Sequence, residues 1–300
     1  MSIVPFDDRD GWIWLDGEFV PWREANLHVL SHAMHYGSAV FEGERMYAGR
    51  IFALAAHTRR LFRSAEILDF DIPFTEAEIN DACVATCVKN KLSDCYVRPI
   101  AWRGAEQLSV SALATKTRVA IAVWDWPKYF DAARFQRGVR LCWAKYRRPP
   151  ADAAPTSAKA AGLYMICTVS KNAAERAGYD DALMLDSAGA IAETTGANIF
   201  FIRDGALYTP TPHCFLDGIT RQTVISLARD AGVRVIETTI RPEELHTFTE
   251  CFIVGTAAEV TPVGEIGDHR FTPGRLTFDL VDRYAARVRD HVNAPALESA

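Results

Sequence analysis

The distribution of apolar and polar residues predicts a chain in which strands and helices are interspersed. Two strand-like runs, Trp12–Leu15 and Glu18–Val20, flank the dipeptide Asp16-Gly17. This dipeptide tolerates the positive φ angles of a two-residue turn. The pattern therefore predicts a β-hairpin near the start of the chain.

Apolar periodicity predicts the remaining elements along the chain. Helical spacing predicts helices at Leu54–Leu68, Glu76–Lys91 with Thr75 as N-cap, Gly162–Gly178, Ile219–Ala231 and about Pro273–His291. Short apolar or alternating runs predict strands at Tyr96–Trp102, Val119–Trp124, Val139–Lys145, Ala182–Asp186, Ala190–Glu193, Asn198–Arg203, Ala206–Tyr208, Val233–Thr239 and Cys251–Val254.

This order of elements fits two mixed α/β domains, an α/β fold of the α+β type. Pro127 and the residues after it break the pattern. We therefore expect an N-terminal α/β domain at residues 1–127, a linker at 128–136, and a C-terminal α/β domain at 137–300.

The composition is typical of an ordinary soluble globular protein, with 49% hydrophobic and 24% charged residues among 300. The formal net charge is −5 and the basic residues are scattered, which argues against nucleic acid or an anionic membrane as a partner. Residues 1–9 contain three charges, and no apolar run reaches membrane-spanning length, so we expect a cytoplasmic location. The seven dispersed cysteines are expected to be reduced and buried.

One stretch, Pro155–Tyr164, places a single lysine, Lys159, among small uncharged residues just before a predicted helix. In a confined site, desolvation favours the neutral amine, which is a nucleophile toward carbonyl groups. An ordinary solvated lysine in a loop is the alternative. The stretch by itself favours that alternative.

Three further features suit an anionic or cationic ligand. Gly218 precedes a helix whose first amides, at Ile219 and Thr220, are free to bind an anion, and Gly255–Ala258 has side chains small enough for backbone amides to approach one. Glu193 ends an apolar strand, where a carboxylate needs a cationic partner. A common turn, a tightly packed strand end and a solvated strand exit are the respective alternatives.

The pair His32 and His35 has a spacing that metal ligands can adopt. No cysteine, aspartate or glutamate set completes a coordination shell around it. We therefore predict no metal site.

The lysine, the carboxylate and the two anion sites together match the needs of one cofactor, pyridoxal 5'-phosphate. From Trp14 to Val263, the chain resembles the branched-chain-amino-acid aminotransferases among the fold-type IV pyridoxal-phosphate enzymes. The shared motifs are His32–Gly37, Phe41–Gly43, Arg60-Leu61, Tyr96–Pro99, Ala158–Ala160, Glu193–Asn198, Gly218–Arg221 and Gly255–Glu259. The resemblance implies the D-amino-acid-aminotransferase-like architecture, an active site between the domains, and a homodimer or a higher homo-oligomer of dimers.

The resemblance also implies a role for each matching residue. Lys159 corresponds to the lysine that forms the Schiff base and then moves a proton, Glu193 pairs with the ring nitrogen, and Tyr164 binds the phenolic oxygen of the ring. The implied phosphate contacts are Arg60, Gly218, Ile219, Thr220 and Thr256. The implied substrate contacts are Tyr36, Phe41, Tyr96, Arg98, Tyr129, Ala257 and Ala258.

The implied activity is a ping-pong transamination from L-leucine, L-isoleucine or L-valine to 2-oxoglutarate. Two regions that shape the substrate pocket in this family depart from its pattern. Glu44 replaces the aliphatic residue that often follows Phe-Glu-Gly, and Gly104–Ser111 lacks a Gly-Met-Gly run. An (R)-selective amine or D-amino-acid transaminase is therefore the first alternative, an aminodeoxychorismate-lyase-like enzyme is a more distant one, and a binding protein without chemistry is the non-enzymatic one.

Overall fold

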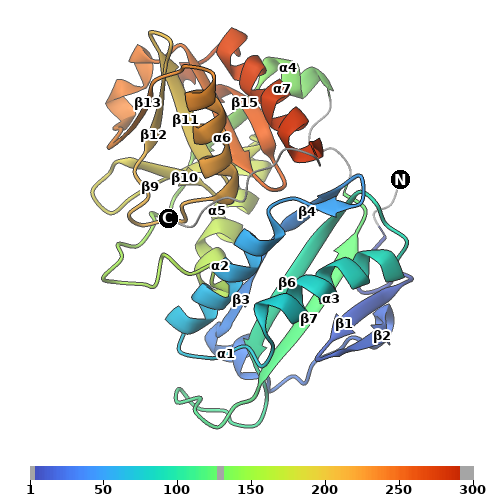
Figure 1. The fold of residues 1–300 in the computed structure, drawn as a ribbon. Helices are drawn as coiled ribbons and strands as arrows, with labels where there is room; N and C mark the ends of the chain where they lie inside the picture. Colours follow the sequence, from blue (N-terminus) through green and yellow to red (C-terminus); the bar gives the residue numbers. More distant parts are fainter. Residues whose placement is uncertain (1–3, 127–131, 291–300) are drawn as a thin grey trace. The chain divides into compact units, whose positions relative to one another are not determined.

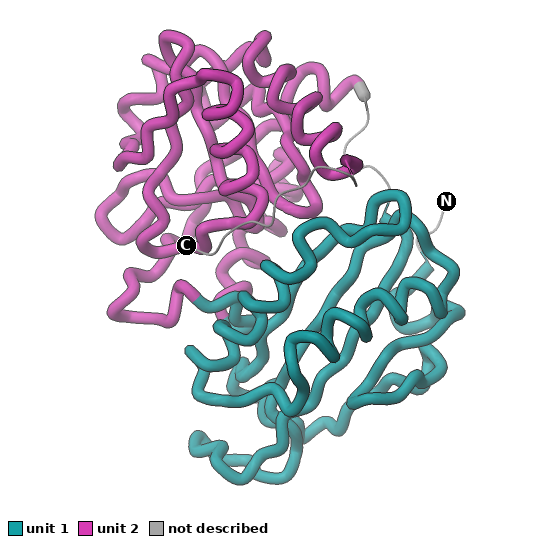
Figure 2. Tube along the Cα trace, in the orientation of Figure 1, with its two compact units in different colours: residues 1–127, 158–162, 295–300 teal, residues 128–157, 163–294 magenta. Residues whose placement is uncertain are grey.

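The computed structural model describes residues 4–126 and 132–290 (Figure 1). Contacts within the chain divide it into two compact units, shown in different colours in Figure 2. Among the described residues, unit 1 comprises residues 4–126 and 158–162, and unit 2 comprises residues 132–157 and 163–290. Both contain helices and a sheet, so the predicted fold class, two mixed α/β domains, is confirmed.

Unit 1 is a seven-stranded antiparallel sheet with helices α2 and α3 packed on it (Figure 1). Its strand order is β2-β1-β7-β6-β4-β5, and β3 also pairs with β6. Its elements are β1 (Trp12–Leu15), β2 (Glu18–Pro21), η1 (Trp22–Glu24), α1 (His32–Tyr36), β3 (Ala39–Phe41), β4 (Glu44–Tyr47), β5 (Arg50–Ile51), α2 (Leu54–Ile67), α3 (Glu76–Lys89), β6 (Cys95–Arg103) and β7 (Thr117–Trp124).

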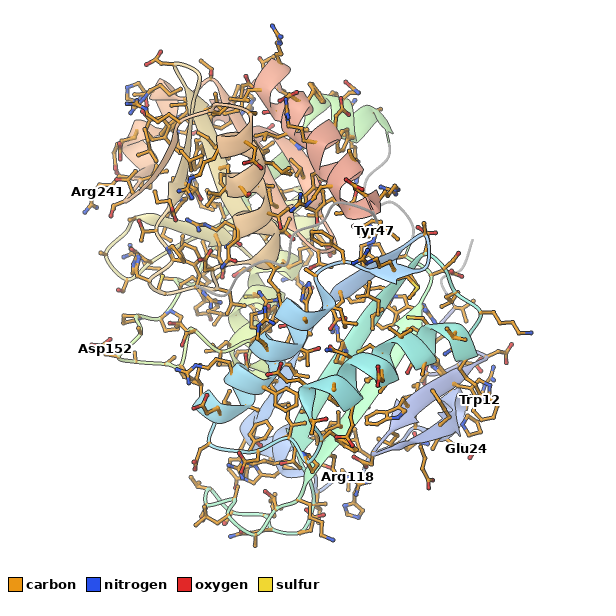
Figure 3. All side chains as sticks on the ribbon, in the orientation of Figure 1. Trp12, Glu24, Tyr47, Arg118, Asp152 and Arg241 are labelled. Carbon is orange, nitrogen blue, oxygen red and sulfur yellow. The ribbon has the colours of Figure 1, made fainter. Side chains whose placement is uncertain are left out.

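The predicted hairpin is β1–β2, and its turn residue Asp16 attaches it to the rest of the sheet. One carboxylate oxygen of Asp16 accepts a hydrogen bond from the backbone N–H of Val119 at 2.8 Å. The other accepts a hydrogen bond from the Nε–H of Arg118 at 2.6 Å; Arg118 is labelled in Figure 3. The positive φ of Asp16, 48°, is the left-handed conformation expected in this turn. The turn therefore also fixes the hairpin beside β7.

Helix α3 shows why the predicted helices form. The hydroxyl of Thr75 accepts the backbone N–H of Glu78, and the Glu78 carboxylate accepts the backbone N–H of Thr75, which is a complete capping box. Ile79, Cys83 and Cys87 recur every four residues and are fully buried in the core of unit 1. Local capping and one apolar stripe together place the helix on the sheet.

Unit 2 is built on a nine-stranded mixed sheet of order β10-β9-β8-β15-β14-β11-β12-β13, with β16 paired to β15. Helices α6 and α7 pack on it through β14 and β15 (Figure 1). The elements in this part of the chain are α4 (Ala132–Arg137), β8 (Val139–Trp143), η2 (Ala161–Leu163), α5 (Tyr164–Arg176), β9 (Asp181–Leu185), β10 (Ile191–Thr194), β11 (Asn198–Arg203), β12 (Ala206–Pro210), α6 (Ile219–Asp230), β13 (Val235–Thr238), η3 (Pro242–Thr247), β14 (Glu250–Gly255), β15 (Glu259–Ile266), β16 (His269–Arg270) and α7 (Arg275–Arg289).

The centre of this sheet is buried on both faces. Ile199 and Phe201 of β11 point into one core cluster, and Phe200 between them stacks on Phe252 of β14, with ring centroids 5.1 Å apart. Successive side chains of a strand point to opposite faces, so a run of apolar residues such as that of β11 requires cover on both. This explains why β11 and β14 lack polar alternation.

Strand β15 was not predicted as a separate element. Pro262 and Gly264 weaken its sequence pattern, since proline donates no ladder hydrogen bond and glycine has no side chain to pack. In the structure, β14 pairs with it along five residues and β8 pairs on its other side. Tertiary pairing therefore overrides the local preference.

The segment that carries Lys159 differs from the expected domain division. The sequence placed it in the C-terminal domain, whereas residues 158–162 group with unit 1. The reason is backbone pairing, because Ala160 forms an antiparallel bridge with Val40. The predicted linker at 128–136 lies partly outside the described residues, and the domain boundaries stay a prediction.

All seven cysteines are free thiols, and all but Cys142 are buried, as expected. Across residues 4–126 and 132–290, no helix is long and apolar enough to cross a membrane.

Two glycines with nearly equal φ angles allow a test of the packing between β8 and β15. Gly138 (φ 80°) and Gly178 (φ 78°) both adopt a conformation that strains other residues, but only Gly138 lies against backbone, where an added Cβ would be 2.6 Å from the carbonyl carbon of Val263. We expect Gly178→Ala to lower the free energy of unfolding by about 1 kcal/mol. Gly138→Ala should lower it by about 3 kcal/mol or more. Denaturant unfolding would check this, and equal losses would contradict it.

Candidate active site

Lys159 is held by its backbone on unit 1. Its N–H donates to the hydroxyl of Ser64 in α2 at 2.9 Å, and its carbonyl accepts the N–H of Phe41 at 3.2 Å. Its Nζ lies 5.0 Å from the centroid of the Phe41 ring. The backbone of Lys159 is thus fixed on both sides, and its amine lies over an aromatic face. Asp152, labelled in Figure 3, marks the loop that precedes this segment.

Two predicted substrate residues, Phe41 and Tyr96, contact a third, Arg98. The guanidinium carbon of Arg98 lies 4.8 Å from the ring of Phe41 and 5.2 Å from that of Tyr96, and its Nη2 donates to the Tyr96 hydroxyl at 3.2 Å. The ring of Trp124 lies 5.9 Å from the same carbon. Aromatic faces attract such a cation. Among the described residues, no carboxylate pairs with Arg98, and its buried Nε has no hydrogen-bond partner.

Arg60 is oriented by a buried carboxylate that sequence reasoning missed. Its Nε and Nη2 donate to the two oxygens of Glu42 at 2.6 and 2.8 Å, and His57 Nδ1 lies 2.7 Å from the same carboxylate. Burial by itself would raise the pKa of Glu42, but Arg60 and His57 outweigh it and hold that pKa well below its usual range. The acidic residue inside the apolar Phe41–Gly43 motif was the available signal.

Glu44 faces the core of unit 1. It pairs with Val97 across β4 and β6, and directly opposed residues point to the same face, which for Val97 is the hydrophobic core. Both Glu44 oxygens are buried without a hydrogen-bond partner. Burial, and then the charge of Glu42, raise the pKa of Glu44 well above its usual 4.5, while Arg60 lowers it less. Glu44 is therefore a neutral acid in the core, on the face of the sheet opposite to Tyr96 and Arg98.

In unit 2, the carboxylate of Glu193 on β10 contacts two polar side chains that the sequence did not single out. Arg148 Nε lies 3.4 Å from one oxygen, and the amide of Asn198 donates to the other at 3.4 Å. The Glu193 side chain is 13% exposed, so part of it faces outward. The carboxylate is thus oriented by its own unit.

At the start of α6, where the sequence predicts an anion site, the structure has a helix N-terminus whose first turn contains no acidic residue. Ile219 and Thr220 are buried there. The guanidinium of Arg221, 1% exposed, anchors this turn by binding Asp217 at 2.8 Å and Glu237 at 2.7 Å. The first-turn amides of a helix lack intrahelical acceptors and favour anions.

The second predicted anion site follows the end of β14. Gly255 packs against Gly196 and Ala197, which directly precede Asn198, and Thr256–Ala258 form a partly exposed turn. This turn joins β14 to β15, which belong to the same sheet as β10, the strand of Glu193.

Other predicted residues are distributed as follows. Tyr36 is 48% exposed at the end of α1, and Tyr164 begins α5 in unit 2. Tyr129 lies outside the described residues. His32 uses both ring nitrogens in structural contacts, with Ser38 at 2.6 Å and the carbonyl of Ser109 at 2.8 Å. No group of three metal-binding side chains occurs in the parts of the chain that the structure describes.

Known proteins identify the fold and the family. The pattern of the amino-transferase class IV family matches residues 39–266. A Pseudomonas aeruginosa branched-chain-amino-acid aminotransferase is 42% identical over 272 residues, covering 89% of each chain. A T.th. branched-chain amino acid aminotransferase with pyridoxamine 5'-phosphate has a TM-score of 0.90 at 39% identity, covering 93% of this chain and 94% of that one. Its complex with N-(5'-phosphopyridoxyl)-L-glutamate has a TM-score of 0.89 at 38% identity, with the same coverage.

This chain belongs to the class IV aminotransferase family. The family resemblance inferred from the motifs is therefore confirmed, and so is the expectation that the protein is an aminotransferase. In this class IV aminotransferase, Lys159, Phe41, Tyr96 and Arg98 are brought together within unit 1, and Glu193 and the start of α6 belong to unit 2.

The buried acid Glu44 gives this class IV aminotransferase a testable pH dependence. In the unfolded chain Glu44 ionises above about pH 4.5, whereas in the folded chain it stays neutral, so its contribution to stability is present below that pH and lost as pH rises. Gln cannot ionise. We expect Glu44→Gln to raise the free energy of unfolding by about 2 kcal/mol or more near pH 7.5, and by less near pH 5.

The matched control is Glu18→Gln at an exposed position of β2, which should change the free energy of unfolding little at either pH. Denaturant unfolding at both pH values measures the difference. A destabilised Glu44→Gln variant at the higher pH would show that Glu44 has a stabilising partner.

Proposed function

We propose that this aminotransferase uses pyridoxal 5'-phosphate to move the amino group of L-leucine, L-isoleucine or L-valine to 2-oxoglutarate in a ping-pong reaction. Its relatives support this proposal, because the Pseudomonas aeruginosa protein carries the branched-chain name and one structure of the T.th. enzyme contains a phosphopyridoxyl-glutamate. The observation that carries the substrate class is Arg98, a cation among aromatic rings with no carboxylate partner in the described residues.

The residues predicted to bind the cofactor suit its phosphate, its ring nitrogen and its phenolic oxygen. The backbone amides of Ile219 and Thr220, in the first turn of α6, suit a phosphate. Gly218 precedes this turn, and Thr256 follows the end of β14, where the second anion site is predicted. Arg60 adds a guanidinium that Glu42 orients. The carboxylate of Glu193 suits a protonated ring nitrogen, and the hydroxyl of Tyr164 suits the phenolic oxygen of the ring.

When bound, this cofactor withdraws electrons from the α-carbon of the substrate. In our proposal, Lys159 holds the cofactor covalently and, once released, its Nζ carries the proton of the α-carbon. Glu193 keeps the ring nitrogen protonated. The backbone hydrogen bonds of Lys159 support this role, because they fix the point from which its amine moves.

Arg98 and the aromatic residues explain how two unlike substrates share one site. Phe41, Tyr96 and Trp124 provide an apolar surface that suits an aliphatic side chain. Arg98 lies on that surface and binds the distal carboxylate of 2-oxoglutarate, which an aliphatic donor lacks. Tyr36, Tyr129, Ala257 and Ala258 complete the proposed substrate contacts.

The (R)-amine or D-amino-acid alternative rested partly on Glu44. Since the Glu44 side chain points into the core of unit 1, it does not support a changed substrate pocket. We further propose a homodimer acting in the cytoplasm. Light scattering coupled to size exclusion would test the dimer.

Lys159 is tested first. Borohydride reduction of the cofactor-loaded enzyme should leave the cofactor on the peptide that contains Lys159. Lys159→Ala should abolish this adduct and lower turnover by about 10²- to 10⁴-fold or more. The exposed Lys145 is the control, and Lys145→Ala should keep both adduct and turnover. An adduct on any other lysine would overturn the assignment.

The substrate proposal is tested by single-turnover reactions with a panel of donors. Leucine, isoleucine and valine should each convert the bound cofactor to its amino form. Arg98→Gln should lower kcat/KM for 2-oxoglutarate by about 10- to 100-fold, because it removes a charge-assisted contact, and should affect the leucine half-reaction less. Faster conversion by an (R)-arylalkylamine, or none by the three branched-chain donors, would favour the alternative.

A further inference from the structure

Arg148 is a buried arginine that contacts Glu193. It lies in the loop between β8 and the Lys159 segment and is only 4% exposed, whereas its neighbour Arg147 is exposed. Besides Glu193, its Nε contacts the carbonyl of Cys214 at 3.3 Å, and its Nη1 lies 3.7 Å from the sulfur of Cys167. A buried guanidinium requires such compensation, because its desolvation is costly.

Asn198 makes the matching contacts on the other side of the carboxylate. Its amide nitrogen donates to Glu193 and also to the carbonyl of Leu216 at 3.1 Å. Its amide oxygen lies against Gly218, where a Cβ would overlap it. Gly218 therefore allows Asn198 to reach the chain that leads into α6.

Arg148 and Asn198 thus make the same two kinds of contact. Each holds one oxygen of Glu193, and each also binds a backbone carbonyl in the segment Cys214–Gly218. This segment ends where the N-terminus of α6 begins. The carboxylate and the helix start are therefore connected through two side chains, both within unit 2.

We propose that Arg148 and Asn198 are positioning residues that hold both oxygens of Glu193 and couple this carboxylate to the phosphate-binding start of α6. The proposal rests on the proposed role of Glu193 toward the ring nitrogen. A carboxylate held from two sides keeps one orientation, and a neighbouring guanidinium favours its ionised form. A shift at the ring end of the cofactor is then transmitted to its phosphate end.

A purely structural role for Arg148 is the competing explanation. It would stabilise the loop before Lys159 without affecting the bound cofactor. The two explanations differ in what a spectroscopic probe on the cofactor detects, because neither Arg148 nor Asn198 belongs to the proposed phosphate contacts.

The test uses the full-length enzyme loaded with pyridoxal 5'-phosphate labelled with ¹⁵N in the ring. Arg148→Met removes the charge, Arg148→Lys retains it, and Asn198→Ala removes the second donor. We expect Arg148→Met and Asn198→Ala to shift both the ring ¹⁵N resonance and the phosphate ³¹P resonance, and to weaken cofactor affinity by about 10-fold or more. Arg148→Lys should fall between Arg148→Met and the unmodified enzyme.

Arg147→Met is the matched control, because Arg147 is exposed and donates to the carbonyl of Ser187. It should leave both resonances and the affinity unchanged. Resonances unchanged in folded Arg148→Met and Asn198→Ala would overturn the proposal, as would a ¹⁵N shift without a ³¹P shift. If Arg148→Met does not fold, Arg148→Lys and Asn198→Ala decide the question by the same readouts.

Glu193→Gln separates this inference from the proposed function. If Glu193→Gln leaves the ring ¹⁵N resonance unchanged, Glu193 is not the ring partner and both proposals fail. If Glu193→Gln shifts it and the Arg148 and Asn198 variants do not, the proposed function stands and only the coupling is overturned.

Discussion

The backbone pairing of the Lys159 segment with unit 1 is the constraint on which the site depends. A lysine side chain has four rotatable bonds, so its amine is well placed only when its backbone is fixed. Here, the N–H of Lys159 is bound by Ser64, its carbonyl is bound by Phe41, and Ala160 bridges Val40. The amine therefore starts from a defined point beside Phe41, and less freedom remains to be lost when it reacts.

Both units orient a functional charge with a second, more buried charge. In unit 1, the Glu42 carboxylate accepts two hydrogen bonds from Arg60. In unit 2, Arg148 contacts the carboxylate of Glu193. Isolated buried charges are costly, but a pair with further hydrogen-bond donors is tolerated and has one preferred geometry. Glu44 shows the limit of this arrangement, because the core offers it no donor and it persists as the neutral acid. Two carboxyl groups only two residues apart therefore have opposite protonation states.

The sequence by itself determined the elements with strong local signals. The Thr75 N-cap of α3, the Asp16-Gly17 turn and the apolar runs of β11 and β14 depend on neighbours along the chain, and all were predicted. Motifs also pointed to Lys159 and Glu193 as candidates, and the family was recognised from them. These features could be predicted from the sequence because their physical causes lie within a few residues of one another.

Only the tertiary structure decided which residues support the site. Strand β15 forms against its local preference because β14 and β8 pair with it, and the Lys159 segment joins unit 1 because Val40 lies beside it. Arg148 and Asn198 are 45 and 5 residues from Glu193 along the chain, and no periodicity relates them. Long-range contacts of this kind arise from how strands are ordered in a sheet, which local sequence does not encode.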